Sequence, residues 1–385
     1  MSGATMDFDL PEDLQLFQTL MRRFVDRELI PLEPRGELDA ATHDMLREKA
    51  KAAGLWMLDV PVELGGQGLG AVGMSIFWEE LSRTVAISPR DTRVFRSLVG
   101  PILLGLKREQ KERFLMPVLR GDWTPCFAIT EADAGSDPTS IRTVAVRDGD
   151  HYVINGVKRF ITDARRADVV QLIAYTDKSK GLRGLSCFLV EMRTPGVSVT
   201  ADYDTMMGDR PCEVTFDNVR IPATNLVGSE GDGMALAQQW ITEGRILRHG
   251  ARSLGVAERC LELGISYSRQ RQTFGAPLAA RQAIQFMIAD TYAELQQARL
   301  LVRDAALDLE RGRDVRLKSW IAKSQATEMG FRAVDRCMQM HGGMGLTTEM
   351  PIERMWREQR SFIITEGAAE VMRASISKKV YDLYE

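Results

Sequence analysis

Apolar residues recur at intervals of three and four over residues 10–120, which indicates amphipathic helices in the first third of the chain. In residues 11–29, Pro11 suits the first turn of a helix, and the apolar side chains share one face: Phe17, Leu20, Met21, Phe24 and Val25. Residues 39–54 repeat the pattern and stop at Gly54, a residue typical of a helix C-terminus. We therefore predict a helical N-terminal domain.

The pattern changes near residue 125, where short segments rich in β-branched and aromatic residues replace the helical spacing. Pairs of turn-forming residues separate these segments: Asp148-Gly149, Asn155-Gly156 and Pro195-Gly196. Short strands joined by such turns predict an antiparallel β-domain.

After Gly233 the helical spacing returns. Apolar residues alternate at three and four positions from residue 284 to residue 309, and the pattern stops at Gly312. A second long helix is predicted from about residue 315 to His341. Long helices joined by short loops favour an antiparallel bundle.

The predicted fold class is therefore a multidomain α+β protein. We expect an N-terminal all-α domain in residues 1–124, a central antiparallel β-domain in 125–232 and a C-terminal four-helix-bundle domain in 233–385. This order disfavours a doubly wound α/β fold. No Gly-x-Gly-x-x-Gly follows a predicted strand, so the sequence does not indicate a Rossmann dinucleotide site.

Composition narrows the function classes. The formal net charge of −3 gives no reason to expect a nucleic-acid or membrane partner, and no apolar run reaches the ~18 residues of a spanning helix. The five cysteines are scattered without a Cys-x-x-Cys pair, which argues against a disulfide framework and against a zinc site. The acidic N-terminus resembles neither a secretory signal nor a transit peptide, so we expect a cytoplasmic protein, with a processed organelle protein as the alternative.

Two neighbouring segments carry candidate binding chemistry. Residues 126–143 combine a tight turn with the hydroxyls of Thr130 and Ser136, which suits a phosphate or a polar ring edge, although a plain connector would use the same residues. In Phe160-Ile161-Thr162, an aromatic ring precedes a hydroxyl at a predicted strand end. That pair could support a flat heterocycle, or Phe160 could belong to the core.

Two later segments join or end the long helices. Residues 268–286 contain an arginine cluster around Thr273-Phe274-Gly275, which suits a diphosphate or simply caps helices. Residues 338–351 contain Gly342-Gly343, which allows close approach of a ligand or serves as a helix C-cap.

Five motifs then stand in a fixed order: Thr-Glu-x-x-Ala-Gly-Ser-Asp, Phe-Ile-Thr, Arg-x-Thr-Phe-Gly, Gln-x-x-Gly-Gly-x-Gly and Glu-Gly-Ala-Ala-Glu-Val. In this order and on this layout the chain resembles an acyl-CoA dehydrogenase over essentially its whole length. The resemblance implies a three-domain FAD enzyme, usually a homotetramer, that oxidises an acyl-CoA substrate and passes electrons to an electron-transferring flavoprotein.

The resemblance also implies roles for individual residues. Thr130 and Ser136 match positions against the flavin and its diphosphate, and Phe160 and Thr162 match the pair beside the isoalloxazine ring. Contacts to the FAD of a neighbouring subunit are implied for a further set: Arg271, Phe274, Gln282, Gln339, Gly342 and Gly343. Arg245 and Gly367 are expected near the substrate.

Ile-Thr-Glu occurs three times, so the chain offers three candidate bases: Glu131, Glu243 and Glu366. Glu366 follows an apolar run, precedes Gly367 and matches the family's commonest base position, which favours it as the catalytic base. As an alternative, Glu366 could be a helix N-terminal residue that favours the helix dipole. Glu243 is out of register with the second base position known in the family, and Glu131 belongs to the flavin loop.

The sequence departs from the family pattern in two places. Thr365-Glu366-Gly367-Ala368 replaces the common Tyr-Glu-Gly-Thr, which removes a hydroxyl, and Arg357-Glu358 replaces Arg-Asp. Neither change removes a residue that the expected reaction needs, but with both changes the sequence does not identify the subfamily. An oxidase or monooxygenase of the same fold, or a non-enzymatic subunit of a hetero-oligomer, stay open as alternative functions, and the acyl group is not determined.

Overall fold

The computed structural model describes residues 9–35, 38–88, 93–96 and 99–384. These residues form two compact units, neither of which is one continuous stretch of chain. The first unit takes the chain up to Phe95, then Arg245–Ile363 and the residues from Ser375 onward; the second takes Arg96–Gly244 and Ile364–Ala374. The three domain boundaries drawn from the sequence stay predictions. The start of the acidic N-terminus, residues 1–8, lies outside the described residues.

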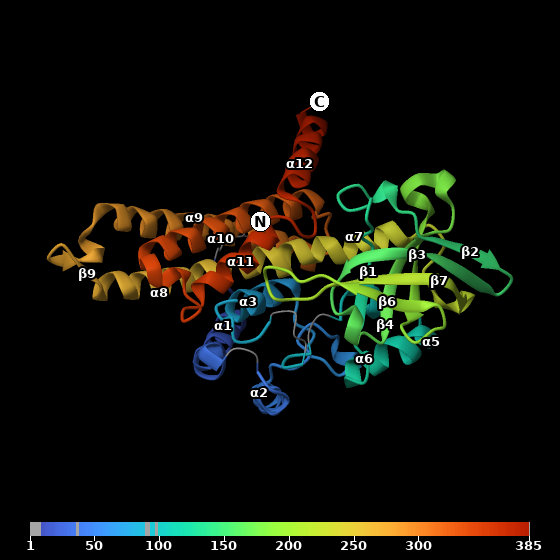
Figure 1. Ribbon diagram of the computed structural model, residues 1–385, viewed down its shortest axis with the longest axis horizontal. Helices are drawn as coiled ribbons and strands as arrows, with labels where there is room; N and C mark the ends of the chain where they lie inside the picture. Colours follow the sequence, from blue (N-terminus) through green and yellow to red (C-terminus); the bar gives the residue numbers. More distant parts are fainter. Residues whose placement is uncertain (1–8, 36–37, 89–92, 97–98, 385) are drawn as a thin grey trace, which may run out of the picture. The chain divides into compact units, whose positions relative to one another are not determined.

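Helices build the first unit. Its long helices α8 (Arg252–Gln270), α9 (Gln282–Glu310) and α10 (Arg316–His341) pack side by side (Figure 1). The two long helices predicted from the apolar spacing are confirmed, since α9 ends two residues before Gly312 and α10 ends at His341. The other helices of this unit are α1 (Glu12–Phe24), α2 (Ala40–Ala52), α3 (Ala71–Leu81) and α11 (Ile352–Phe362).

Helix α3 lies in the centre of this unit and touches the bundle closely. Every residue from Val72 to Leu81 is buried. A Cβ atom on Gly255 of α8 would lie 1.8 Å from the carbonyl oxygen of Glu79, so only glycine permits this approach. The buried carboxylates of α3 are paired: Glu79 with Arg299 of α9, and Glu80 with Arg22 of α1 and with Arg83. The N-terminal helices and the C-terminal bundle therefore share one core.

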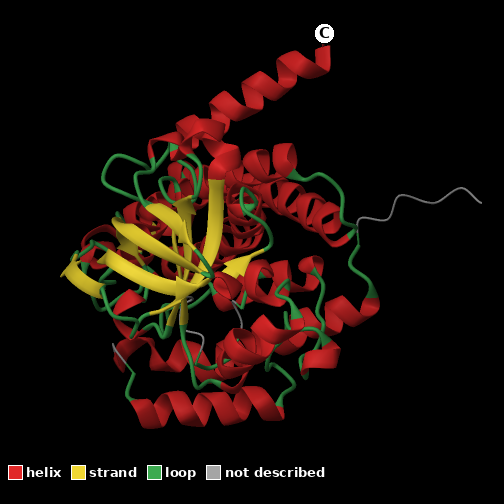
Figure 2. Ribbon diagram, turned by 90° about the vertical axis from the view of Figure 1, so that its right-hand side faces the viewer, coloured by secondary structure: helices red, strands yellow, loops and turns green. Residues whose placement is uncertain are grey.

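A twisted sheet dominates the second unit (Figure 2). Its path is β6-β7-β3-β2-β4-β5-β8, and β1 pairs with β4. The predicted β-domain is confirmed, and most pairs are antiparallel, but β1–β4 and β2–β4 are parallel. The strands are β1 (Pro125–Ala128), β2 (Val144–Asp148), β3 (His151–Ile161), β4 (Val169–Tyr175), β5 (Leu185–Glu191), β6 (Val197–Asp202), β7 (Cys212–Pro222) and β8 (Leu226–Val227).

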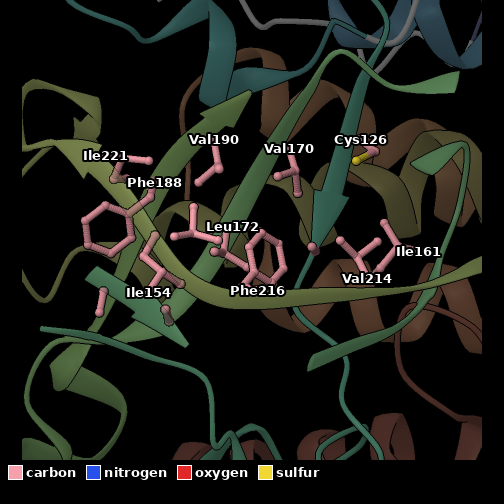
Figure 3. Close-up of a cluster of buried hydrophobic side chains, with 14 of the residues drawn as sticks. Cys126, Ile154, Ile161, Val170, Leu172, Phe188, Val190, Val214, Phe216 and Ile221 are labelled. Atoms are coloured by element: carbon pink, nitrogen blue, oxygen red, sulfur yellow. The ribbon is translucent and has the colours of Figure 1, made fainter. Parts of the chain in front are cut away.

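Alternate residues of these strands supply the core of the second unit. Ile154 from β3, Leu172 from β4, Phe188 from β5 and Phe216 from β7 are buried together, as Figure 3 shows. This alternation is the pattern expected where one sheet face packs inward. The sheet therefore forms a rigid platform for the loops at its strand ends.

Short helices complete the second unit: α4 (Pro101–Leu104), α5 (Arg108–Gln110), α6 (Met116–Arg120) and α7 (Gly233–Gly244). Helix α12 (Ala369–Tyr384) begins in the second unit and continues into the first. Among the helices described, none has the length and apolar character needed to cross a membrane.

Candidate active site

The loop after β1 is held by a buried ion pair. The ammonium group of Lys158, on β3, lies 2.7 Å from the carboxylate of Glu131, and both side chains are buried. Lys158 Nζ also donates to the carbonyl oxygen of Ile129 at 2.9 Å. The Glu131 carboxylate accepts three further hydrogen bonds, from the backbone N–H groups of Arg142 and Thr143 and from the Thr143 hydroxyl. Glu131 is therefore fully engaged in the structure of the loop.

For both Lys158 and Glu131, burial and the ion pair shift the pKa in opposite directions. Burial lowers the pKa of Lys158 to about 8, although the charge of Glu131 opposes this shift. For Glu131, burial alone raises the pKa, but the charge of Lys158 and the hydrogen bonds outweigh it and hold the pKa below its ordinary value. Each of the two groups therefore favours the charged form of the other.

The same loop carries the predicted flavin contacts Thr130 and Ser136. The Thr130 carbonyl oxygen accepts a hydrogen bond from the Arg159 N–H at 2.8 Å, which fixes the loop against β3. The Thr130 side chain is partly exposed, and Ser136 is exposed beside Gly135, where a Cβ atom would meet nothing within 4 Å. Both residues are therefore open to solvent at least in part.

The end of β3 is bent by an irregularity in its pairing. The register with β7 shifts between Lys158 and Ile161, which is a bulge-like feature that re-aims side chains. Within it, Phe160 adopts a φ of +56°, an unfavourable conformation for a bulky residue, and 56% of its surface is exposed. The core alternative for Phe160 is therefore wrong. Its ring lies 4.8 Å from that of Tyr203, and the partly exposed Thr162 follows the strand.

Among the candidate residues of the second unit, Glu366 is the second, after Phe160, to have a strained backbone. Its φ is +53°, and the following Gly367 has a φ of +106°. Non-glycine residues in this region cost free energy and concentrate at functional sites. Glu366 lies between α11 and α12, three residues before α12 begins at Ala369, so it precedes the first turn of that helix. Glu243, by contrast, has ordinary helical surroundings in α7.

The turn between α8 and α9, in the first unit, presents three predicted contacts to solvent. Arg271 and Gln282 are exposed, and Phe274 is 99% exposed with a φ of +48°. The hairpin of β9 (Gln272–Thr273) and β10 (Ala276–Pro277) forms this turn. Arg281 braces it by donating to the carbonyl oxygens of Thr273 and Phe274. The guanidinium carbon of Arg281 lies 5.8 Å from the centre of the Phe274 ring, which is otherwise open to solvent within this unit.

The last predicted contacts lie at the end of α10. Gln339, Gly342 and Gly343 are exposed, Gly342 has a φ of +58°, and a Cβ atom on either glycine would meet nothing within 4 Å. Beneath them, the buried ring of His341 stacks on Tyr267 with centroids 4.3 Å apart. Arg245 is buried in the π-helical segment Arg245–Ala251. It belongs to the first unit, whereas Glu366 belongs to the second.

These residues suit FAD better than a metal. Hydroxyl groups, exposed aromatic rings, an exposed arginine and open glycine backbone match the hydroxyls, flat ring system and diphosphate of a dinucleotide. In the described part of the chain, no three His, Cys, Asp or Glu side chains gather in a way that could hold a metal ion.

Sequence reasoning missed Lys158. The signal was present, because Tyr152, Ile154 and Lys158 share the inward parity of β3, and a lysine at an inward position is unusual. Tyr203 was missed as well, and no local pattern marks it.

Comparison with known proteins places the chain in a family. It matches the N-terminal, middle and C-terminal domains of acyl-CoA dehydrogenases over residues 11–122, 126–219 and 231–381. The fold and the comparisons thus define an oxidoreductase of this three-domain class, whose members are flavoproteins. The chain belongs to the acyl-CoA dehydrogenase family, which confirms the predicted fold class and the resemblance.

Individual relatives cover nearly the whole chain. The mouse mitochondrial short-chain specific acyl-CoA dehydrogenase is 36% identical over 372 residues, which is 96% of this chain and 90% of that protein. The caffeyl-CoA reductase–Etf complex subunit CarC of Acetobacterium woodii is 34% identical, over 95% of this chain and 97% of that one. The structure of butyryl-CoA dehydrogenase from Megasphaera elsdenii has a TM-score of 0.86 at 31% identity, covering 98% of this chain and all of the other.

Proposed function

We propose that this protein catalyses the FAD-dependent α,β-dehydrogenation of an acyl-CoA thioester to the 2-enoyl-CoA, with Glu366 as the catalytic base. The observation that carries this assignment is the strained backbone of Glu366 and Gly367, with φ of +53° and +106°. A glutamate held in this conformation, directly before a glycine, is explained by a requirement on where its carboxylate and N–H point. Of the three Ile-Thr-Glu glutamates, Glu131 is engaged by Lys158, and Glu243 has no such strain.

Glu366 would remove the proton from Cα of the acyl group. That proton is very weakly acidic, so the negative charge that develops on the thioester oxygen needs hydrogen-bond donors. By resemblance to the family, the backbone N–H of Glu366 is one of these donors. Glu366 is partly buried, so the access of water to it is restricted. FAD, when bound, supplies the acceptor for the hydride that leaves Cβ.

Each unit would contribute cofactor contacts of its own. Phe160 and Thr162 would lie beside the isoalloxazine ring, and Thr130 and Ser136 beside the flavin and its diphosphate. The exposed residues Arg271, Phe274, Gln282, Gln339, Gly342 and Gly343 would contact the FAD of a neighbouring subunit. The support is their exposure together with their match to family positions. On this proposal the protein is a homotetramer, and Arg245 and Gly367 lie near the substrate.

An electron-transferring flavoprotein is the proposed redox partner. One relative is a subunit of a caffeyl-CoA reductase–Etf complex, and one similar solved chain comes from a study of the electron-transferring flavoprotein of Acidaminococcus fermentans.

Relatives named as reductases favour a second candidate function, the reverse reaction. The 3-(aryl)acrylate reductase of Clostridium sporogenes is 33% identical over 96% of this chain. In that direction, reduced FAD, when bound, would supply the hydride that Cβ of a 2-enoyl substrate receives, and Glu366 would deliver the proton to Cα.

An anaerobic titration tests the proposal. The purified protein is mixed with a panel of saturated acyl-CoAs while its visible absorption is followed, and bleaching of the flavin band by one of them is expected. Reduced protein mixed with 2-enoyl-CoAs tests the reverse direction. Rapid reoxidation by oxygen would indicate the oxidase alternative, and a protein that takes up no FAD would contradict the proposal.

The base assignment is tested with matched glutamate variants. Glu366→Gln is expected to retain FAD but to lose bleaching by about 10²–10⁴-fold in rate, the usual contribution of a general base. Glu243→Gln is the control and is expected to bleach at a rate close to that of the wild type. Bleaching by Glu366→Gln together with loss in Glu243→Gln would reverse the assignment.

A further inference from the structure

Lys158 joins the two segments that carry the flavin contacts of the second unit. Its backbone lies on β3, two residues before Phe160 and four before Thr162, while its ammonium reaches the loop that holds Thr130 and Ser136. The next residue, Arg159, donates its N–H to the Thr130 carbonyl oxygen at 2.8 Å. Two consecutive residues of β3 therefore bind three consecutive residues of the loop.

The bonds made by Lys158 lie on both sides of Thr130. Nζ donates to the Ile129 carbonyl oxygen at 2.9 Å and to the Glu131 carboxylate at 2.7 Å. Because the Thr130 carbonyl oxygen is bound by Arg159, three adjacent residues of the loop are fixed in position by one strand. Lys158 has no exposed surface and so cannot touch a ligand itself.

Net stability is a poor explanation for this ion pair. Removing a lysine and a glutamate from water costs several kcal/mol for each ion, and apolar residues of similar volume often replace such pairs without loss of stability. An ion pair does, however, fix the distance between its two groups and their orientation, which an apolar contact does not. The feature that needs such fixing is the bulged end of β3, where Phe160 adopts its strained φ beside the loop.

We propose that Lys158 is a positioning residue for the flavin: its buried ammonium holds the loop of Thr130 and Ser136 in register with Phe160 and Thr162, so that the four side chains meet one cofactor. This inference rests on the proposed function, because it concerns the geometry of the FAD site. It assigns Lys158 no contact with FAD or substrate. The expected consequence is that loss of Lys158 lowers FAD affinity even where the stability of the fold is restored by removing the charge of Glu131.

The test compares Lys158→Met with a matched variant of the same sheet. Tyr152 is also buried on β3, and its hydroxyl donates to the exposed Glu230, so Tyr152→Phe removes a partly buried polar contact away from the flavin loop. FAD dissociation constants are measured by flavin fluorescence on deflavinated full-length protein, and melting temperatures are measured without FAD. Lys158→Met is expected to weaken FAD binding at least tenfold and to change the visible circular dichroism of the flavin that does bind. Tyr152→Phe is expected to bind FAD like the wild type.

A double variant keeps the test decisive if Lys158→Met folds poorly. Lys158→Met with Glu131→Gln leaves no uncompensated carboxylate, so its melting temperature is expected to recover toward that of the wild type. The Ile129 carbonyl oxygen still lacks its lysine donor, so the loss of FAD affinity is expected to persist.

Two results would overturn the inference alone: FAD binding by Lys158→Met within twofold of the wild type, or recovery of FAD affinity in step with melting temperature in the double variant. A wild-type protein that takes up no FAD would instead overturn the proposed function, and this inference with it.

Discussion

The guanidinium of Arg299 donates a 2.8 Å hydrogen bond to the carboxylate of Glu79, although 220 positions separate the two residues. The Glu79 side chain is buried, and Arg299 also lies 2.7 Å from Glu258. The pair joins α3 of the N-terminal helices to α9 of the C-terminal bundle within one compact unit. The first unit is therefore completed by contacts that no local segment can make alone.

Removal of Arg299 is expected to destabilise the protein strongly. Arg299→Leu leaves the buried Glu79 carboxylate without its hydrogen-bonded ion-pair partner, and loss of one partner of a buried pair costs about 3–5 kcal/mol. The control is Arg316→Ala, because Arg316 pairs with Asp314 at the surface and such pairs contribute about 0–1 kcal/mol. Urea unfolding of both variants measures the difference. Equal losses would show that Glu79 does not depend on its partner.

Glu131 is expected to make stability depend on pH in the acid range. Its pKa is held below the ordinary value of 4.5, because the charge of Lys158 and the hydrogen bonds outweigh the effect of burial. A lowered carboxylate pKa contributes stability that is present above pH 4.5 and is lost as pH falls through the lower, folded-state pKa. Glu131→Gln resembles the protonated form, so its deficit relative to the wild type should be largest near neutral pH and should shrink below pH 4.5.

Thr143→Val extends this measurement. It removes one hydrogen bond from the Glu131 carboxylate, so the folded-state pKa should rise and the acid loss of stability should begin at a higher pH. The free energy of unfolding, measured by denaturant titration at each pH, checks both variants. A deficit of Glu131→Gln that stays constant with pH would contradict the assignment.

Phe274 is expected to matter for assembly and cofactor retention but not for folding of the single chain. Its side chain is 99% exposed, so Phe274→Ala should change the free energy of unfolding of the apoprotein by no more than about 0.5 kcal/mol. If the ring contacts the FAD of a neighbouring subunit, the variant should lose FAD on gel filtration and shift toward smaller oligomers. Leu16→Ala, at a position 65% exposed on α1, serves as the control. Unchanged FAD content in Phe274→Ala would contradict the cross-subunit proposal.

The parts of the fold that depend on local periodicity could be predicted from the sequence. The spacing of apolar residues identified α9 and α10, because a helix repeats its buried face every three or four residues. Turn pairs and β-branched segments identified the sheet. The parallel pairing of β1 with β4 could not be predicted, since it joins strands that are distant in the chain.

The candidate site, too, could be predicted from the sequence only in part. Motif order located Glu366, Phe160 and Thr130, but the features that distinguish them arise only in three dimensions. The positive φ of Glu366 and Phe160 depends on how neighbouring segments constrain the backbone, and periodicity carries no such information. Likewise, Lys158 appears in the sequence as one lysine in a strand, and its ion pair with Glu131 depends on a loop 27 positions away.

The separation of Glu79 from Arg299 has a consequence for biosynthesis. A ribosome that adds roughly 5–20 residues per second needs about 10–45 s to make the intervening 220 residues. During that time, helix α3, in which every residue from Val72 to Leu81 is buried in the finished protein, has no bundle to pack against. The nascent N-terminal helices therefore spend this interval as an apolar surface on which Glu79 lacks its partner Arg299, whereas Glu80 already has Arg22 and Arg83. Such a segment is the kind that a chaperone shields from aggregation until the later helices emerge.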